Sequence, residues 1–203
     1  MAAFRAAIAA DVGIECDLRL TSDHKIVVFH DSDAWRLCGY SLLIGDTPCD
    51  EVQRLNVGGD PIPRLEELLA LVDGQVPLLL EVKVEADVRH WVPVLKKALV
   101  NYRGKHGVMS FDPRISRLLK LAHPRVRRGL VIRDELAPVR RRVALMLADP
   151  HFIAVERTAV GNSWVQAIRE RLPVYSWTIR GPQQRVQAQV HADALIWEAD
   201  GRP

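Results

Sequence analysis

The sequence predicts an α/β fold built around a parallel sheet, of the TIM-type (β/α)8 barrel class but lacking its first strand, with a small insertion after the second strand unit. Short β-branched and apolar runs recur along the chain, most of them followed by a segment with apolar residues at helical spacing. This alternation is typical of parallel sheets. Counting the first two runs as one unit gives seven strands, one fewer than an eight-stranded barrel contains. Because 203 residues with 48% hydrophobic content suffice for one core, we expect a single domain over residues 1–203.

The elements follow in chain order. The alanine-rich segment Ala2–Ala10 is expected to be helical, because alanine has the highest helix propensity. The predicted strands are Ile14–Leu20, Lys25–Phe29, Leu78–Val84, Gly107–Phe111, Gly129–Ile132, Phe152–Val155, Val174–Ile179 and Ala194–Trp197. The predicted helices are Leu65–Val72, Val92–Val100, Ile115–Leu121, Val139–Leu147, Trp164–Arg171 and Gln183–Val190. Only Thr21–His24 separates the first two strands, which is too short for a crossover helix, so we expect either an antiparallel pair or one strand and its extension. The stretch Asp31–Pro63 shows little periodicity and is interpreted as a functional loop or a small insertion.

Composition and charge narrow the class of protein. Three cysteines without close spacing argue against a disulfide framework, and we expect reduced thiols with Cys16 buried. Neither an apolar run long enough to span a membrane nor a secretory signal is visible, so we expect no stable membrane insertion and a cytoplasmic location. The net charge is +3, and the clustered arginines lack interleaved aromatic residues, so they are interpreted as solvated faces and no nucleic-acid partner is expected. An anionic membrane surface or a phosphate substrate is the alternative partner of these arginines.

Carboxylates on two predicted strands are candidate metal ligands. Strand alternation directs Glu15 and Asp17 to one face, and two like charges so close require a cation, an arginine or a shared proton. The apolar run Leu78–Leu80 continues into Glu81, a charge that a buried strand tolerates only with a partner. At the carboxyl end of a barrel strand, Glu81 can join the first pair, and three carboxylates suit magnesium or calcium. A solvent-facing edge strand is the alternative interpretation of the first pair.

Three further side chains are candidates for substrate binding or catalysis. Lys83 offers positive charge to an anionic substrate, unless it and Glu81 are only a structural neighbour pair. His30 stands at a strand end beside Asp31, and an imidazole in that place is suited to proton transfer near neutral pH. Trp177, near the end of the next-to-last strand, lines a ligand pocket in one interpretation and belongs to the core in the other.

Taken in order, these motifs resemble those of the glycerophosphodiester phosphodiesterase family. The first are Ile-Glu-Cys-Asp-Leu-Arg-Leu-Thr at 14–21 and Val-Val-Phe-His-Asp at 27–31. Later segments similar to the family's are Ile62–Glu67, Leu80–Lys83, Ser110–Phe111, Tyr175–Thr178 and Ala192–Ile196. The similarity spans essentially the whole chain, and the joint order is far more specific than any single motif.

The resemblance implies a TIM-type barrel that hydrolyses glycerophosphodiesters to glycerol 3-phosphate and an alcohol, in lipid and glycerol metabolism. The resemblance implies that Glu15, Asp17 and Glu81 bind a divalent metal, Mg2+ or Ca2+. It also implies that His30 acts in acid–base catalysis, that Lys83 contacts the phosphate and that Trp177 contacts the glycerol moiety. The implied partner is therefore a small-molecule phosphodiester.

The chain departs from the family pattern at its beginning. The family's His-Arg-Gly and Pro-Glu-Asn-Thr motifs precede a helix that resembles Ala2–Ala10, and they have no counterpart in the sequence. We therefore expect hydrolytic activity to be impaired and the chain to self-associate through the barrel edge that the missing strand leaves exposed. Two alternatives stay open: a non-catalytic module that binds metal or phosphodiester on the same fold, and a phosphodiesterase that cleaves lysophospholipids.

Overall fold

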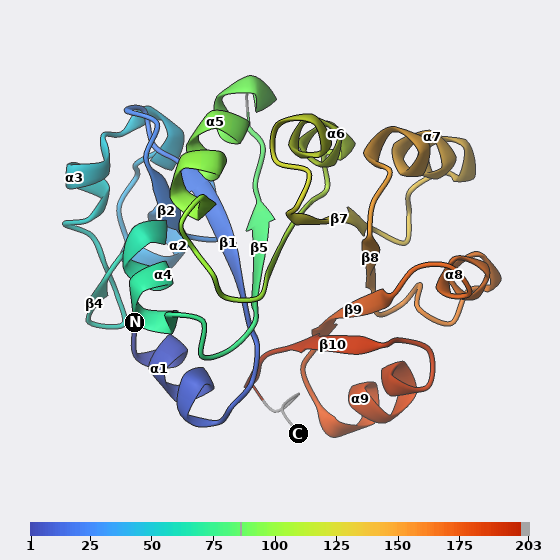
Figure 1. Ribbon diagram of the computed structural model, residues 1–203. Coiled ribbons are helices and arrows are strands. Elements are labelled where there is room, and N and C mark those ends of the chain that lie inside the picture. Colours follow the sequence, from blue (N-terminus) through green and yellow to red (C-terminus); the bar gives the residue numbers. More distant parts are fainter. Residues whose placement is uncertain (86, 200–203) are drawn as a thin grey trace. The chain divides into compact units, whose positions relative to one another are not determined.

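The computed structural model describes residues 1–85 and 87–199, which form two compact units (Figure 1). The first unit contains residues 1–108 and 118–126, and the second contains residues 109–117 and the chain from residue 127 onward. Strand β6 (His106–Ser110) and helix α6 (Pro113–Ala122) contribute residues to both units. The single domain over residues 1–203 stays a prediction, and residues 200–203 lie outside the described part of the chain.

Three strands of the first unit position the candidate site residues. Strand β1 (Ile14–Leu20) pairs in parallel with β5 (Leu78–Val82), and their register places Asp17 beside Glu81. Strand β2 (Ile26–Val28) pairs with the end of β1 in the antiparallel direction. Of the two arrangements expected from the sequence, the antiparallel pair is therefore the one observed.

Two of the helices in the first unit, at residues 65–72 and 88–99, bury apolar residues on one face. Helix α1 (Ala2–Ala9) and helix α4 (Leu65–Val72) lie close to the predicted bounds, and α4 packs beside both α1 and β2. Helix α5 (Val88–Leu99) begins earlier than predicted, because Asp87 caps it by accepting a hydrogen bond from the backbone N–H of Arg89 at 2.9 Å. Its buried residues are Val88, Trp91, Val92, Leu95 and Leu99.

The insertion predicted between residues 31 and 63 packs around a small apolar core to which Val27 and Phe29 also contribute. Its elements are helix α2 (Trp35–Cys38), the 3-10 helix η1 (Ile44–Asp46), helix α3 (Cys49–Val52) and the short strands β3 (Asn56–Val57) and β4 (Asp60–Pro61). The residues of this core are Val27, Phe29, Ala34, Ile44, Cys49, Val52, Leu55 and Ile62. The elements are too short for a periodic pattern, which is why sequence periodicity did not reveal them.

The second unit is a parallel series of strands joined by helices. Its strands are β7 (Arg127–Ile132), β8 (Phe152–Glu156), β9 (Val174–Ile179) and β10 (Ala194–Trp197), each paired in parallel with the next. Its connecting helices are α7 (Pro138–Ala148), α8 (Ser163–Arg169) and α9 (Pro182–Gln189). Their apolar core includes Leu130, Ile153 and Val155. Position 129 must be glycine for this packing, because a Cβ atom there would lie 2.3 Å from the ring of Phe152.

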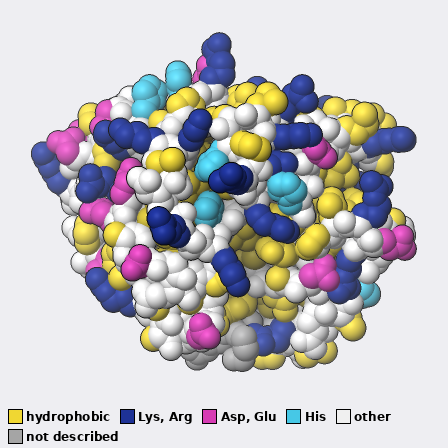
Figure 2. Space-filling view, viewed as in Figure 1, with side chains coloured by type: hydrophobic (Ala, Val, Ile, Leu, Met, Phe, Trp, Pro, Cys, Tyr) yellow, Lys and Arg dark blue, Asp and Glu magenta, His cyan; other side chains and the backbone are white. Residues whose placement is uncertain are grey.

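The predicted alternation of strands and helices is confirmed, since each predicted element has a counterpart with similar bounds. All three cysteines are free, and Cys16 is buried as predicted. Among the described residues, no helix is both long and apolar enough to cross a membrane. Figure 2 shows that Lys and Arg side chains are spread over the visible face and stand among Asp and Glu side chains, as is usual for a solvated surface.

Candidate metal and catalytic site

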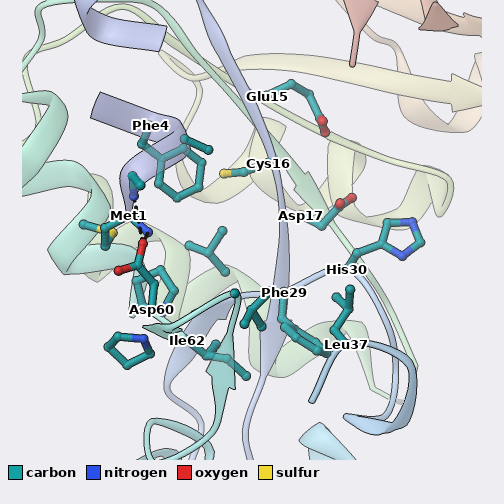
Figure 3. Close-up of a pocket in the computed structure, with 17 residues that line it drawn as sticks. Met1, Phe4, Glu15, Cys16, Asp17, Phe29, His30, Leu37, Asp60 and Ile62 are labelled. Carbon is teal, nitrogen blue, oxygen red and sulfur yellow. Dashed lines mark hydrogen bonds and ion pairs between the residues drawn. The ribbon is translucent and has the colours of Figure 1, made fainter. Parts of the chain in front are cut away.

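Strand β1 presents alternate side chains to opposite faces of the sheet. Glu15 and Asp17 point to one face and Cys16 points to the other (Figure 3), as the two-residue period of a strand requires. Burial, together with the charges of Glu15 and Asp17, raises the pKa of the Cys16 thiol well above its ordinary value. The strand therefore brings the two carboxylates together on one face and places the buried thiol on the other.

Glu81 brings a third carboxylate to the same place. It lies beside Asp17 in the register of β1 and β5, and one carboxylate oxygen from each of Glu15, Asp17 and Glu81 lies within 4.8 Å of the others. Calcium binds oxygen ligands at about 2.3–2.6 Å, so oxygens at this separation can share one cation. The donor set is made of hard oxygen ligands, which fits a divalent cation of the magnesium and calcium class.

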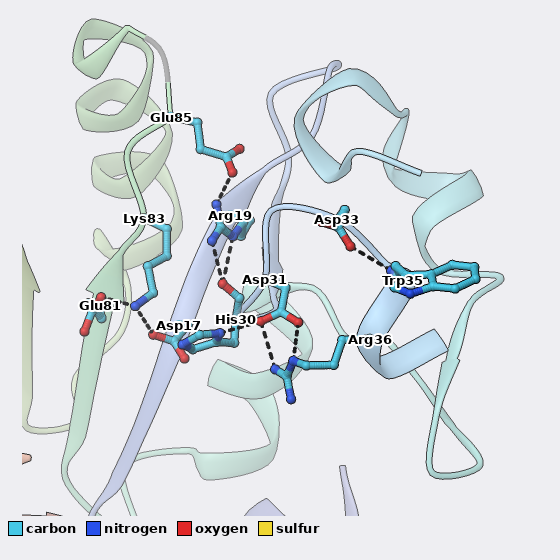
Figure 4. Close-up of polar contacts among 10 residues, drawn as sticks. All are labelled: Asp17, Arg19, His30, Asp31, Asp33, Trp35, Arg36, Glu81, Lys83 and Glu85. Carbon is cyan, nitrogen blue, oxygen red and sulfur yellow. Dashed lines mark hydrogen bonds and ion pairs between the residues drawn. The ribbon is translucent and has the colours of Figure 1, made fainter. Parts of the chain in front are cut away.

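The ammonium group of Lys83 lies among these carboxylates. Its Nζ atom is 2.9 Å from Oδ1 of Asp17 and also contacts Oε1 of Glu81 (Figure 4). Burial lowers the pKa of Lys83, but the charges of Glu81 and Asp17 outweigh burial and hold this pKa above its ordinary value. Burial also raises the pKa of Glu81, which Lys83 opposes. Both directions reflect an excess of negative charge in a poorly solvated place.

His30 follows β2 and lies beside the carboxylates. The backbone N–H of Phe29 donates to the carbonyl oxygen of Asp17 at 2.9 Å, which continues the pairing of the two strands past the end of β2. Figures 3 and 4 both show the His30 side chain next to Asp17. Its Nδ1 atom lies 2.6 Å from Oδ1 of Asp31, and 61% of its side chain is exposed. The ring is therefore held at one nitrogen and accessible to a ligand.

A cavity of about 460 Å3 adjoins these residues. Glu15, Asp17 and His30 contribute polar lining, and the apolar lining includes Phe4 and Phe29 (Figure 3). Small-molecule sites typically measure roughly 300–1,000 Å3 and combine apolar walls with a few polar groups. The cavity has the size and the lining of such a site.

Two arginines that hold this region in place were not among the candidates from the sequence. Arg19 is buried and donates through Nε and Nη2 to the carbonyl oxygen of His30, at 3.0 and 2.6 Å, while its Nη1 donates to Glu85. Arg36 donates to both carboxylate oxygens of Asp31, at 2.7 and 2.8 Å. The two-residue alternation of β1 places Arg19 on the same face as Glu15 and Asp17, so the sequence did contain a signal for this residue. The contact of Arg36 depends on the course of the insertion, for which the sequence gives no comparable signal.

Trp177 belongs to the second unit. Its ring makes an edge contact with Phe111, with ring centroids 5.6 Å apart, and the guanidinium of Arg133 lies over the ring of Phe111. Within the described residues, the indole Nε1 is buried and has no hydrogen-bond partner. The tryptophan is half-buried, which agrees with either of the two interpretations from the sequence.

Comparisons with known proteins agree on one family. Residues 1–199 match the sequence model of the glycerophosphoryl diester phosphodiesterase family. The Bacillus subtilis protein YhdW is 23% identical over 93% of this chain and 83% of its own length. A glycerophosphodiester phosphodiesterase of Caldanaerobacter subterraneus is 29% identical over 64% of this chain and 59% of its own length.

Solved structures show the same fold. An Oleispira antarctica phosphodiesterase, solved with the product sn-glycerol-3-phosphate, superposes with a TM-score of 0.88 at 20% identity, over 98% of this chain and 87% of that one. The Thermotoga maritima glycerophosphodiester phosphodiesterase gives a TM-score of 0.79 at 24% identity, over 97% and 86% of the two chains. The predicted α/β fold of the TIM-barrel type is confirmed by these structures. Since the family model covers nearly all of its length, this chain belongs to the glycerophosphoryl diester phosphodiesterase family.

Proposed function

We propose that this chain hydrolyses glycerophosphodiesters to glycerol 3-phosphate and an alcohol, with a divalent cation held by Glu15, Asp17 and Glu81. The observation that carries the proposal is the convergence of these three carboxylates within 4.8 Å, beside His30 and next to a cavity of suitable size. Membership of the family and the product bound to the Oleispira antarctica phosphodiesterase support this choice of substrate.

Each side chain has a separate task in the proposed reaction. A bound cation would offset negative charge on the phosphate oxygens. Lys83 adds positive charge beside the same oxygens, where a poorly solvated environment strengthens the attraction. Asp31 is an acceptor when ionised, so its contact favours the proton on Nδ1 of His30 and leaves Nε2 to exchange a proton with the attacking water or the leaving alcohol. Contact between Trp177 and the glycerol moiety stays a prediction from the family resemblance.

The test is turnover of glycerophosphocholine by residues 1–203, measured as release of choline and of glycerol 3-phosphate. Turnover should require added magnesium or calcium and stop in a chelator. Glu81→Gln and His30→Asn should each lower kcat by about 100-fold or more, because they remove a metal ligand and a proton-transfer group. Glu170→Gln changes an exposed carboxylate at the end of α8 and should leave kcat unaltered.

Other outcomes would redirect the assignment. Metal binding by calorimetry without turnover of any diester would favour the non-catalytic module. Faster turnover of lysophosphatidylcholine than of glycerophosphocholine would favour the lysophospholipid substrate. Turnover that persists in Glu81→Gln and in chelator would contradict the proposed use of the three carboxylates.

A further inference from the structure

We propose that two arginines position His30: Arg36 acts on its ring through Asp31, and Arg19 acts on its main chain. The inference rests on the proposed role of His30 in proton transfer. The two arginines come from different elements, α2 and β1, and Figure 4 shows them reaching residues 30 and 31 from opposite sides. Both are positioning residues, because each acts through His30.

The ring of His30 is oriented by a carboxylate that is itself fixed. Arg36 donates through Nε to Oδ2 of Asp31 and through Nη2 to Oδ1, at 2.7 and 2.8 Å. This two-point geometry fixes the plane of the carboxylate as well as its position. The same Oδ1 atom lies 2.6 Å from Nδ1 of His30. The guanidinium of Arg36 also holds the pKa of Asp31 at about 2, so the carboxylate is ionised and accepts the Nδ1 proton at neutral pH.

The main chain of His30 is tied to the strand that presents the carboxylates. The side chain of Arg19 is only 10% exposed, and its Nε and Nη2 atoms converge on the carbonyl oxygen of His30. Glu85 contacts the remaining end of the guanidinium and so limits its movement. Because Arg19 follows Asp17 by two positions on the same strand, its contact fixes the main chain of His30 relative to the strand that carries Glu15 and Asp17.

The ion pair between Arg36 and Asp31 is not well explained by a contribution to folding stability alone. Its side chain is 61% exposed, and exposed ion pairs contribute little to folding stability. Loss of Arg36 should therefore leave the fold intact and release the ring of His30. Groups that orient a ligand or catalytic side chain typically change activity by about 10- to 100-fold when removed. We expect a fall of that size in kcat, with little change in KM.

A double-mutant cycle tests whether the arginines act through His30. Turnover of glycerophosphocholine is measured for the wild type, Arg36→Ala, His30→Ala and the double variant. Arg36→Ala should lower kcat by about 10- to 100-fold in the wild type and have no further effect once His30 is absent. Arg19→Lys, which retains a charge beside Glu85, should follow the same pattern. Arg169→Ala, which breaks an ion pair with Asp193 in the second unit, should leave kcat unaltered.

The protonation of the His30 ring can also be measured directly, in an experiment that does not depend on turnover. At alkaline pH, 15N chemical shifts of His30 should show the proton on Nδ1 in the wild type and a shift toward Nε2 in Arg36→Ala and Asp31→Asn. An Nε2 proton in the wild type, or losses in kcat that persist in the His30→Ala background, would overturn the inference. Failure of the wild type to hydrolyse any diester would instead count against the proposed function, and the chemical shifts would still decide how His30 is held.

Discussion

Replacing Lys83 with methionine removes an ammonium group that contacts both Asp17 and Glu81 and leaves the three carboxylates without it. The carboxylate oxygens lie within 4.8 Å of one another, and at that upper limit two unit charges repel by about 3.5 kcal/mol if the effective dielectric constant is about 20. The side chains of Lys83, Asp17 and Glu81 are 17%, 18% and 9% exposed, so water screens part of this repulsion. Removing one partner of a fully buried pair costs about 3–5 kcal/mol, and an exposed pair contributes below about 1 kcal/mol. We therefore expect Lys83→Met to lower the free energy of unfolding by about 2 kcal/mol in chelator.

Thermal unfolding measures this loss. For a chain of this length, about 2 kcal/mol corresponds to a decrease of roughly 4–8 °C in Tm. Added magnesium or calcium should raise the Tm of Lys83→Met more than that of the wild type, because a divalent cation takes over the charge balance that the ammonium group supplied. Lys97→Met, at an exposed position of α5, is the matched control and should unfold like the wild type with and without metal. Equal metal-induced shifts in Lys83→Met and wild type would refute the reasoning.

Three further predictions follow from packing and charge. Gly129→Ala should reduce stability in urea by about 1–3 kcal/mol, because its Cβ would lie 2.3 Å from the ring of buried Phe152. Asp31→Asn should reduce stability by less than about 1 kcal/mol at neutral pH, since the carboxylate is partly exposed to solvent. The pKa of Asp31 in the folded chain is about 2, below its ordinary value of 3.8. Because the carboxylate stabilises the fold only while it is ionised, the difference in stability between Asp31→Asn and the wild type should disappear as the pH falls from about 4 toward about 2. The thiol of Cys16 should react with an aromatic disulfide reagent only after unfolding, because it is buried and its pKa is raised.

Each of these three predictions has a control or an outcome that would contradict it. An unchanged urea midpoint for Gly129→Ala would mean that the ring of Phe152 moves aside without cost. Asp50→Asn, at a carboxylate whose side chain is 76% exposed, should not show the pH dependence predicted for Asp31. Rapid reaction of Cys16 in the folded chain would contradict its interior position.

The sequence predicted the regular elements well, because each has a pattern of its own. The bounds of Ile14–Leu20 and Leu65–Val72 were predicted as observed, since the first shows two-residue alternation and the second buries apolar residues at helical spacing. The start of α5 was misplaced at Val92, because the capping residue Asp87 was not recognised as the helix start.

The contacts around His30 were harder to predict than the residues that make them. Glu15 and Asp17 share a strand, so their proximity follows from alternation alone. The contact between Arg36 and Asp31 depends on the path of the insertion, whose short elements leave no periodic signal. The hydrogen bond from Arg19 to the carbonyl oxygen of His30 could be predicted only if the register of β1 and β2 were already known.

The small core beneath residues 31–63 has a consequence for how this protein can diversify. Buried residues such as Ile44 and Val52 stabilise this segment, so its exposed side chains do not contribute to the packing of the core. Trp35, Tyr40 and Leu43 are 64%, 60% and 53% exposed. Exchanges at these three positions would alter the surface that incoming molecules meet and leave the carboxylate-bearing strands unchanged, so new preferences can evolve here at little risk to folding.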